Sequence, residues 1–208
     1  MKTVFVFLIT ALAAYFLGCV NGAIIMSKSV FHEDVRKKGS GNAGLTNFYR
    51  NYGAKGVLPV IAMDMLKMVL AVVFARILFE DKALGAFWAG FWAILGHCFP
   101  ATYGFHGGKG ILTAGALLIM LDWRIALVGF GLFFLASVLS GYISLGSLLA
   151  SVSFPLTTFW VYGESQHFIY LLTLSILSAA VTVWSHRSNI RRLLHGEENK
   201  FHIHKQGE

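Results

Sequence analysis

The sequence is poor in charged residues. Only 13% of its 208 residues are Asp, Glu, Lys or Arg, whereas soluble domains carry about 25%. Hydrophobic residues make up 56% of the chain, and the mean hydropathy is +0.66. This composition excludes an ordinary soluble domain and predicts an integral membrane protein. The net charge of +7 therefore indicates attraction to anionic lipid, and we expect no nucleic-acid partner.

Cysteines and linkers are also scarce. The only cysteines, Cys19 and Cys98, lie in different apolar runs, so we expect no disulfide between them. Two cysteines also lack the spacing of a metal site. No long linker, low-complexity tract or convincing repeat divides the chain. We therefore predict a single domain over residues 1–208.

Long apolar runs fill most of the chain. A helix needs about 20 apolar residues to cross a bilayer. The sequence thus predicts an all-α integral membrane fold with seven transmembrane helices, and places the two ends of the chain on opposite sides. The fourth run is short, so it is tilted, partly interfacial or longer than drawn. The seven runs are residues 4–25, 57–79, 83–99, 111–121, 125–139, 143–160 and 168–184.

Basic residues are distributed unevenly over the connections between these runs. One set of connections holds twelve Lys and Arg residues and the other set holds four. Because cytoplasmic loops are enriched in Lys and Arg, we expect the amino terminus outside and the carboxyl terminus in the cytoplasm. Asp64 and Lys67 lie three apart inside a run. Such groups usually pair in the bundle interior, and we favour a structural ion pair over a proton relay.

Unusual polar segments gather on the predicted cytoplasmic side. Residues 39–47 read Gly-Ser-Gly-Asn-Ala-Gly-Leu-Thr-Asn, residues 96–110 include Gly107-Gly108-Lys109-Gly110, and residues 186–192 read His-Arg-Ser-Asn-Ile-Arg-Arg. A weaker segment spans residues 144–147. The count of basic residues did not use these motifs, and chance would scatter them over both faces. Their clustering predicts one functional site, partly built from re-entrant loops.

The first segment has the composition of an anion-binding loop. Glycines let the backbone approach a ligand closely, and successive N–H groups form a nest for an anion. Thr46 and Asn47 are predicted to cap a following helix, whose positive end would add to the site. Arg50 follows one turn later and can grip phosphate with two hydrogen bonds. Alone, the segment is equally typical of a turn before a helix.

The other two segments also have simpler interpretations. Gly107-Gly108-Lys109-Gly110 combines a flexible cradle with a point charge, but it is not a nucleotide P-loop and also fits a surface or re-entrant turn. His97 is more often structural than catalytic at the end of a span. His186 and Asn189 would share a helix face, although a basic flank after a last span is common.

Together, these three motifs resemble the bacterial acyl-phosphate:glycerol-3-phosphate acyltransferases, the PlsY family, over essentially the whole chain. The resemblance implies transfer of an acyl group from acyl phosphate, not from acyl-CoA or acyl carrier protein, to the sn-1 hydroxyl of glycerol 3-phosphate. Lysophosphatidic acid and inorganic phosphate would be the products, in the first step of phospholipid synthesis. The resemblance also implies no metal or other cofactor, and a site on the cytoplasmic face of the bacterial cytoplasmic membrane.

Site residues follow from the same resemblance. It implies catalytic roles for Ser40, Lys109 and His186. It implies that these three bind substrate together with Asn42, Thr46, Asn47, Arg50, Gly108, Ser144, Ser147, Asn189 and Glu198. The chain departs from the family pattern at Ala43, at Gly141, where a basic residue is expected, and at Glu197.

Several questions stay open at this point. The base that takes the hydroxyl proton is either His186 or a substrate phosphate oxygen, and we favour the phosphate. Ser40 as an acyl-enzyme nucleophile lacks an obvious triad. A small-anion or phosphate transporter is the competing function, but it needs access from both sides, whereas the polar segments load one face. A structural lipid-binding subunit leaves those segments unexplained. The oligomeric state is open, a monomer included.

Overall fold

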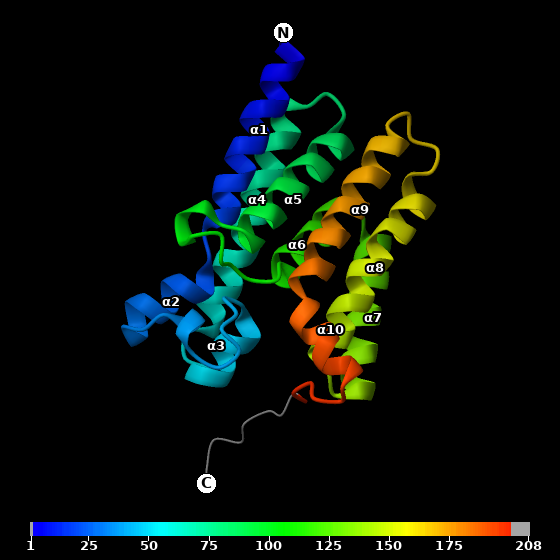
Figure 1. Ribbon diagram of the computed structural model, residues 1–208. Helices are drawn as coiled ribbons and strands as arrows, with labels where there is room; N and C mark the ends of the chain where they lie inside the picture. Colours follow the sequence, from blue (N-terminus) through cyan, green and yellow to red (C-terminus); the bar gives the residue numbers. More distant parts are fainter. Residues whose placement is uncertain (1, 201–208) are drawn as a thin grey trace.

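The computed structural model describes residues 2–200, and every regular element in that range is helical (Figure 1). The described part contains ten α-helices and two 3₁₀ helices. They are α1 (Lys2–Cys19), α2 (Gly22–Phe31), η1 (Val35–Lys37), α3 (Leu45–Tyr52), α4 (Val57–Leu78), α5 (Lys82–Cys98), η2 (Ala101–Tyr103), α6 (Ile111–Leu121), α7 (Trp123–Ser140), α8 (Ile143–Tyr162), α9 (Phe168–Ser185) and α10 (Arg187–Leu194).

Six helical stretches are long and apolar enough to cross a membrane. They are Lys2–Phe31, which joins α1 and α2, and helices α4, α5, α7, α8 and α9. Helix α6 has 11 residues and is therefore about 16 Å long, half of a hydrocarbon core of about 30 Å. The all-α membrane fold is confirmed, whereas seven full spans and their orientation stay predictions.

The first apolar run is not one continuous helix, so the expected span over residues 4–25 is wrong in this respect. Helix α1 ends at Cys19 and α2 begins at Gly22. Asn21 causes the break because its side chain accepts a hydrogen bond from Ile24 N at 2.9 Å, as an N-cap does. The Asn21 amide also donates to Ala43 O at 3.0 Å, which ties the break to the glycine-rich loop.

Small residues let α1 pack closely on α5. A Cβ at Gly18 would lie 2.3 Å from Ala93 O, and one at Gly96 would lie 2.1 Å from Tyr15 O. Close approach through small residues is typical of membrane helices. The rest of the bundle continues through α4, α6 and α9, while α7 packs on α8. Cys19 and Cys98 are both free and buried.

A buried ion pair links these helices, as the sequence predicted. Lys67 Nζ lies 2.9 Å from Asp64 Oδ1, and each side chain is only 2% exposed. Lys67 also donates to Val20 O at 2.6 Å, the carbonyl at the break between α1 and α2. The Asp64 carboxylate accepts from Gly22 N at 3.2 Å. The pair therefore fixes the start of α2 against α4.

Candidate active site

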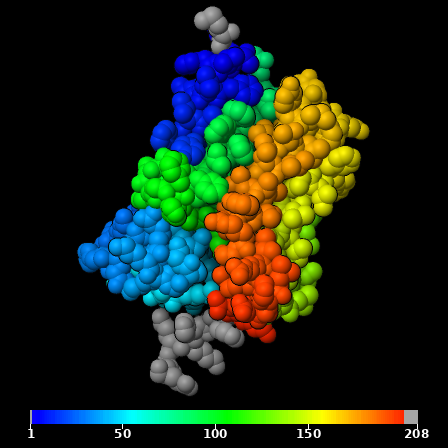
Figure 2. All heavy atoms as spheres, in the orientation of Figure 1, coloured from blue at the N-terminus to red at the C-terminus, as the bar shows by residue number. Residues whose placement is uncertain are grey.

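A cavity of about 390 Å³ lies between the amino-terminal half of the chain and helices α6 to α10. Residues from α3, α4, α5, α6, α7, α8, α9 and α10 line it, together with the loops before α3 and after α10. Figures 1 and 2 show the α2–α3 region and α10 at the end of the molecule opposite the amino terminus. The predicted motifs thus meet in one place.

Asn47 organises the glycine-rich loop. Its side-chain oxygen accepts from Ser40 N at 3.0 Å. Its amide nitrogen lies 2.9 to 3.1 Å from the carbonyl oxygens of Val35, Lys38 and Asn42. Asn47 lines the cavity and is only 4% exposed, but its side chain is used in holding the loop. The loop is therefore shaped by the protein itself.

The predicted cap of α3 is wrong. The N-cap is Gly44, which has no side chain to cap the helix, and Thr46 and Asn47 lie inside the first turn. Within residues 2–200, no group accepts a hydrogen bond from the backbone N–H of Leu45 or Thr46. Uncapped N–H groups at a helix start attract anions. The anion site predicted here is thus supported by an uncapped helix end.

The loop carrying Lys109 is held by backbone hydrogen bonds on both sides. Gly108 N donates to His97 O at 3.1 Å, and Gly107 N donates to Cys98 O at 3.2 Å. On the other side, Ala43 N donates to Gly107 O at 3.4 Å. The loop therefore bridges the end of α5 and the glycine-rich loop, and Lys109 leaves it toward α10.

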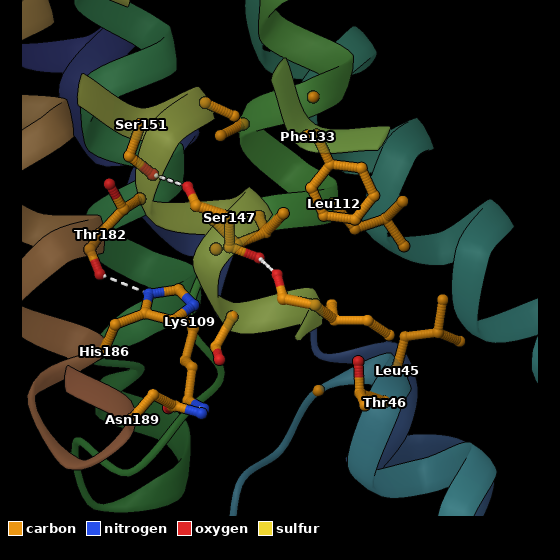
Figure 3. Close-up of a pocket in the computed structure, with 18 of the residues that line it drawn as sticks. Leu45, Thr46, Lys109, Leu112, Phe133, Ser147, Ser151, Thr182, His186 and Asn189 are labelled. Carbon is orange, nitrogen blue, oxygen red and sulfur yellow. Dashed lines mark hydrogen bonds between the residues drawn. The ribbon is translucent and has the colours of Figure 1, made fainter. Parts of the chain in front are cut away.

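Lys109 joins a chain of polar contacts with the last motif. Its ammonium donates to Asn189 Oδ1, and Figure 3 shows the two side chains side by side. Asn189 Nδ2 in turn donates to Glu198 Oε1 at 2.8 Å. The Glu198 carboxylate also accepts from Ser144 Oγ at 3.0 Å and from Arg192 Nε at 2.8 Å. Side chains from α8 and α10 thus converge on one carboxylate, and Lys109 joins them through Asn189.

Positive charge and burial act together on Lys109. Burial, followed by the positive charges of Arg192 and Arg50 and opposed by Glu198, lowers the pKa of Lys109 to about 8. Arg50 reaches the same region, with one guanidinium nitrogen 3.4 Å from Asn199 O. Three cations around a single carboxylate leave an excess of positive charge, which an anionic ligand would neutralise.

His186 lies at the corner between α9 and α10, not on one helix with Asn189 as expected. Its Nδ1 is 2.8 Å from Thr182 O (Figure 3). A carbonyl only accepts hydrogen bonds, so the proton lies on Nδ1, and Nε2 keeps its lone pair. Burial is the main cause that lowers the pKa of His186 to about 4, and Lys109 contributes. The ring is therefore neutral near pH 7.

Eleven of the twelve predicted site residues line the cavity, and the exception is Gly108. Gly108 serves packing, because a Cβ there would lie 2.2 Å from His97 Nε2. Ser147 reaches the cavity, but its hydroxyl donates to Ile143 O at 2.8 Å in its own helix. The eleven are Ser40, Asn42, Thr46, Asn47, Arg50, Lys109, Ser144, Ser147, His186, Asn189 and Glu198.

Sequence reasoning missed other lining residues. Arg192 was noticed only as part of a basic flank, although its side chain pairs with Glu198. Asp64 and His97 also line the cavity, although structural roles were predicted for both. Methylene carbons of Lys200 lie 3.6 Å from where a Cβ at Gly141 would be. The sequence spacing of residues that are far apart in the chain does not indicate which of them are in contact.

The other end of the cavity is apolar. Figure 3 shows Leu112 and Phe133 on the side of the cavity away from Lys109 and Asn189. The residues of α6 and α7 that line the cavity are all uncharged. Its apolar lining on these helices and on α8 includes Ile111, Leu112, Leu118, Phe130, Phe133, Phe134 and Phe154. The cavity therefore suits a ligand with an anionic head and an apolar chain.

Fold and cavity define a class: an all-helical integral membrane protein with a cavity that is cationic at one end and apolar at the other. The family model for glycerol-3-phosphate acyltransferase matches residues 8–196, and the chain belongs to this family.

Curated relatives agree with this assignment. A glycerol-3-phosphate acyltransferase of Thermoanaerobacter sp. (strain X514) is 39% identical over 192 residues, covering 92% of this chain and 94% of the relative. The enzyme of the same name from Halalkalibacterium halodurans is 41% identical over 197 residues, covering 91% and 92%.

Two solved structures share the fold. Both are crystal structures of PlsY (YgiH), an integral membrane glycerol 3-phosphate acyltransferase. The glycerol 3-phosphate form has a TM-score of 0.83 and 31% identity, with 94% of this chain and 96% of the other covered. The lysophosphatidic acid form has a TM-score of 0.81 and 29% identity, with 95% and 96% covered.

Proposed function

We propose that this chain, as one domain over residues 1–208, transfers an acyl group from acyl phosphate to the sn-1 hydroxyl of glycerol 3-phosphate. The products are lysophosphatidic acid and inorganic phosphate, in the first step of phospholipid synthesis. The site faces the cytoplasm from a bacterial cytoplasmic membrane. The supporting observation is the single cavity that joins a cationic end to an apolar end. The related PlsY structures, in glycerol 3-phosphate and lysophosphatidic acid forms, agree with it.

The reaction needs two anionic substrates to lie side by side. Lys109, Arg50 and Arg192 counter their mutual repulsion, and the free N–H groups at the start of α3 add donors. Holding reactants in line can lower a barrier by about 7–11 kcal/mol. Acyl phosphate is already activated, so positioning and electrostatic stabilisation are the main requirements.

The chemical step is a direct displacement. The sn-1 oxygen bonds to the acyl carbon, the bond from that carbon to the phosphate oxygen breaks and inorganic phosphate departs, and the hydroxyl proton passes to a phosphate oxygen of glycerol 3-phosphate. Ser40 is not the nucleophile in this proposal. Within residues 2–200 its hydroxyl makes no hydrogen bond to a His, Asp or Glu side chain, and a serine nucleophile needs an adjacent base.

A substrate phosphate oxygen acts as the base. The pKa of His186 is about 4, which makes its ring a weak base, whereas a phosphate monoester titrates near 6. The lone pair on His186 Nε2 accepts a hydrogen bond from the sn-1 hydroxyl and orients it. His186 thus places the nucleophile, and the phosphate takes the proton.

Phosphate release tests this function. Purified protein with acyl phosphate and glycerol 3-phosphate should release inorganic phosphate and form an equal amount of lysophosphatidic acid. Reactions without glycerol 3-phosphate serve as the control. No product, together with phosphate uptake into vesicles containing the protein, would favour the transporter instead.

A further inference from the structure

The buried lysine of α4 has all three of its N–H bonds occupied. Lys67 Nζ lies 2.6 Å from Val20 O, 2.9 Å from Asp64 Oδ1 and 2.7 Å from His97 Nδ1. An ammonium has three donors and no acceptor. These three acceptors therefore match its hydrogen-bonding capacity completely, and the ion pair described above is part of a larger unit that includes His97.

This arrangement fixes the tautomer of His97. Because Lys67 can only donate, Nδ1 of His97 must accept, and the ring proton must lie on Nε2. Protonating Nδ1 as well would place two N–H donors against each other beside a buried cation. His97 is 3% exposed, so water does not offer an alternative partner on the protein surface.

The Nε2–H of His97 is the free polar edge of a ring that lines the cavity. Its Nδ1 edge is occupied by Lys67 and lies 3.8 Å from Asp64 Oδ1, so Nε2 is the ring nitrogen left to meet a ligand. Nε2 lies 2.2 Å from where a Cβ on Gly108 would be, next to the residue before Lys109. Within residues 2–200, no group accepts a hydrogen bond from it. It is an unpartnered donor on a side chain that lines the cavity.

Lining residues of both kinds, cationic and apolar, are close to this donor in the chain. On its cationic side, Gly108 precedes Lys109. On its apolar side, Ile94 lies one turn earlier on α5 and lines the cavity too. An acyl phosphate with its phosphate near Lys109 and its chain in the apolar end must place its carbonyl group between them.

We propose that His97 Nε2–H donates a hydrogen bond to the acyl carbonyl oxygen, and that Lys67 is its positioning residue. This inference rests on the proposed function. When the sn-1 oxygen attacks, negative charge grows on the carbonyl oxygen, and it disappears when phosphate leaves. His97 keeps its proton throughout and stabilises that charge, as the donors of an oxyanion hole do.

Two variants of similar length test the donor. His97→Gln keeps an N–H near the place of Nε2, whereas His97→Met removes it. We expect kcat to fall about 100-fold in His97→Met and less than about 10-fold in His97→Gln, while KM for glycerol 3-phosphate stays unchanged. The exposed His106 supplies the matched control, and His106→Met should match the wild type.

The outcomes separate this inference from the proposed function. Wild-type protein without acyl transfer would contradict the function itself. Equal kcat values for folded His97→Met and His97→Gln would overturn the donor role only. If His97→Met does not fold, an acyl phosphate with sulphur in place of the carbonyl oxygen, a weaker acceptor, decides. It should slow both the wild type and His97→Gln, because each keeps an N–H donor, and rates that the sulphur leaves unchanged would contradict the proposal.

The positioning role of Lys67 has a separate readout. In wild-type protein labelled with ¹⁵N-histidine, the His97 signal, assigned by its loss in His97→Gln, should show the proton on Nε2. In Lys67→Met, the proton should no longer be confined to Nε2. A wild-type signal with the proton on Nδ1 would overturn the assignment of both residues.

Discussion

At the scale of single residues, we expect activity to depend on the positive charge of Lys109, which lies in the loop between α5 and α6. Lys109 bridges the glycine loop and α10 through Asn189. We expect Lys109→Ala to remain folded and to lose at least about 100-fold in kcat/KM, because the phosphate loses its nearest point charge. Thermal unfolding and phosphate release measure the two effects. Wild-type turnover in this variant would remove Lys109 from the site.

The lowered pKa of Lys109 gives a pH dependence with a defined sign. The ammonium loses its proton as pH rises through about 8. Since kcat/KM reports ionisations of the free enzyme, it should decline above that pH. In Lys109→Arg the guanidinium stays charged, so the decline should be absent. The same decline in both proteins would assign it to another group.

For His186 we expect the pH dependence of the rate to persist when the residue is replaced, in contrast to Lys109. A substrate phosphate as base predicts an inflection of the rate near about pH 6, and this inflection should persist in His186→Gln at a lower kcat. The neutral ring, whose pKa is about 4, adds none of its own there. Loss of the inflection in the variant would identify His186 as the base.

At the scale of elements, Gly108 allows the end of α5, the loop carrying Lys109 and the glycine-rich loop before α3 to pack closely together. A Cβ at Gly108 would lie 2.2 Å from His97 Nε2 and 2.8 Å from Ala43 O. Gly108→Ala should therefore displace Lys109 and raise KM for glycerol 3-phosphate, by about tenfold for a loss of 1.4 kcal/mol. Gly131→Ala is the control, because nothing lies within 4 Å of its added Cβ. Equal kinetics in the two variants would contradict this.

The elements show which parts of the fold the sequence predicts. Apolar runs of 15 to 23 residues identified α4, α5, α7, α8 and α9, because crossing a bilayer imposes length and composition. The break at Asn21 was missed, since one polar residue does not interrupt an apolar run. The cap at Gly44 was missed because its identity depends on where the chain turns, and glycine occurs throughout that loop.

The sequence predicted many of the residues that line the candidate site, but it did not predict which of them contact one another. The motifs identified eleven lining residues because Gly, Ser, Asn, Lys and His are unusual beside apolar runs. The pairing of Arg192 with Glu198 and of Lys67 with His97 depends on tertiary packing. The apolar half of the cavity could not be predicted from the sequence, because a phenylalanine that lines a cavity has the same sequence pattern as one that faces lipid.

At the scale of the whole molecule, the buried ion pair joins the break after α1 to α4 and α5. Removing one charge leaves the other buried without compensation, which typically costs about 3–5 kcal/mol. Asp64→Asn should therefore lower the unfolding temperature markedly, with a smaller loss of kcat per folded molecule than Lys109→Ala. The double variant Asp64→Asn/Lys67→Met should regain stability. A stable but inactive Asp64→Asn protein would instead assign Asp64 a functional role.

The α2–α3 region and α10, which carry the first and last motifs, lie at the end of the bundle opposite the amino terminus (Figure 1). Under the proposed function, a reactive centre near this end delivers each new lipid to the leaflet on that side alone. That leaflet gains area with every turnover while the opposite one does not. Growth of a balanced bilayer around this protein therefore depends on a separate movement of lipid from one leaflet to the other.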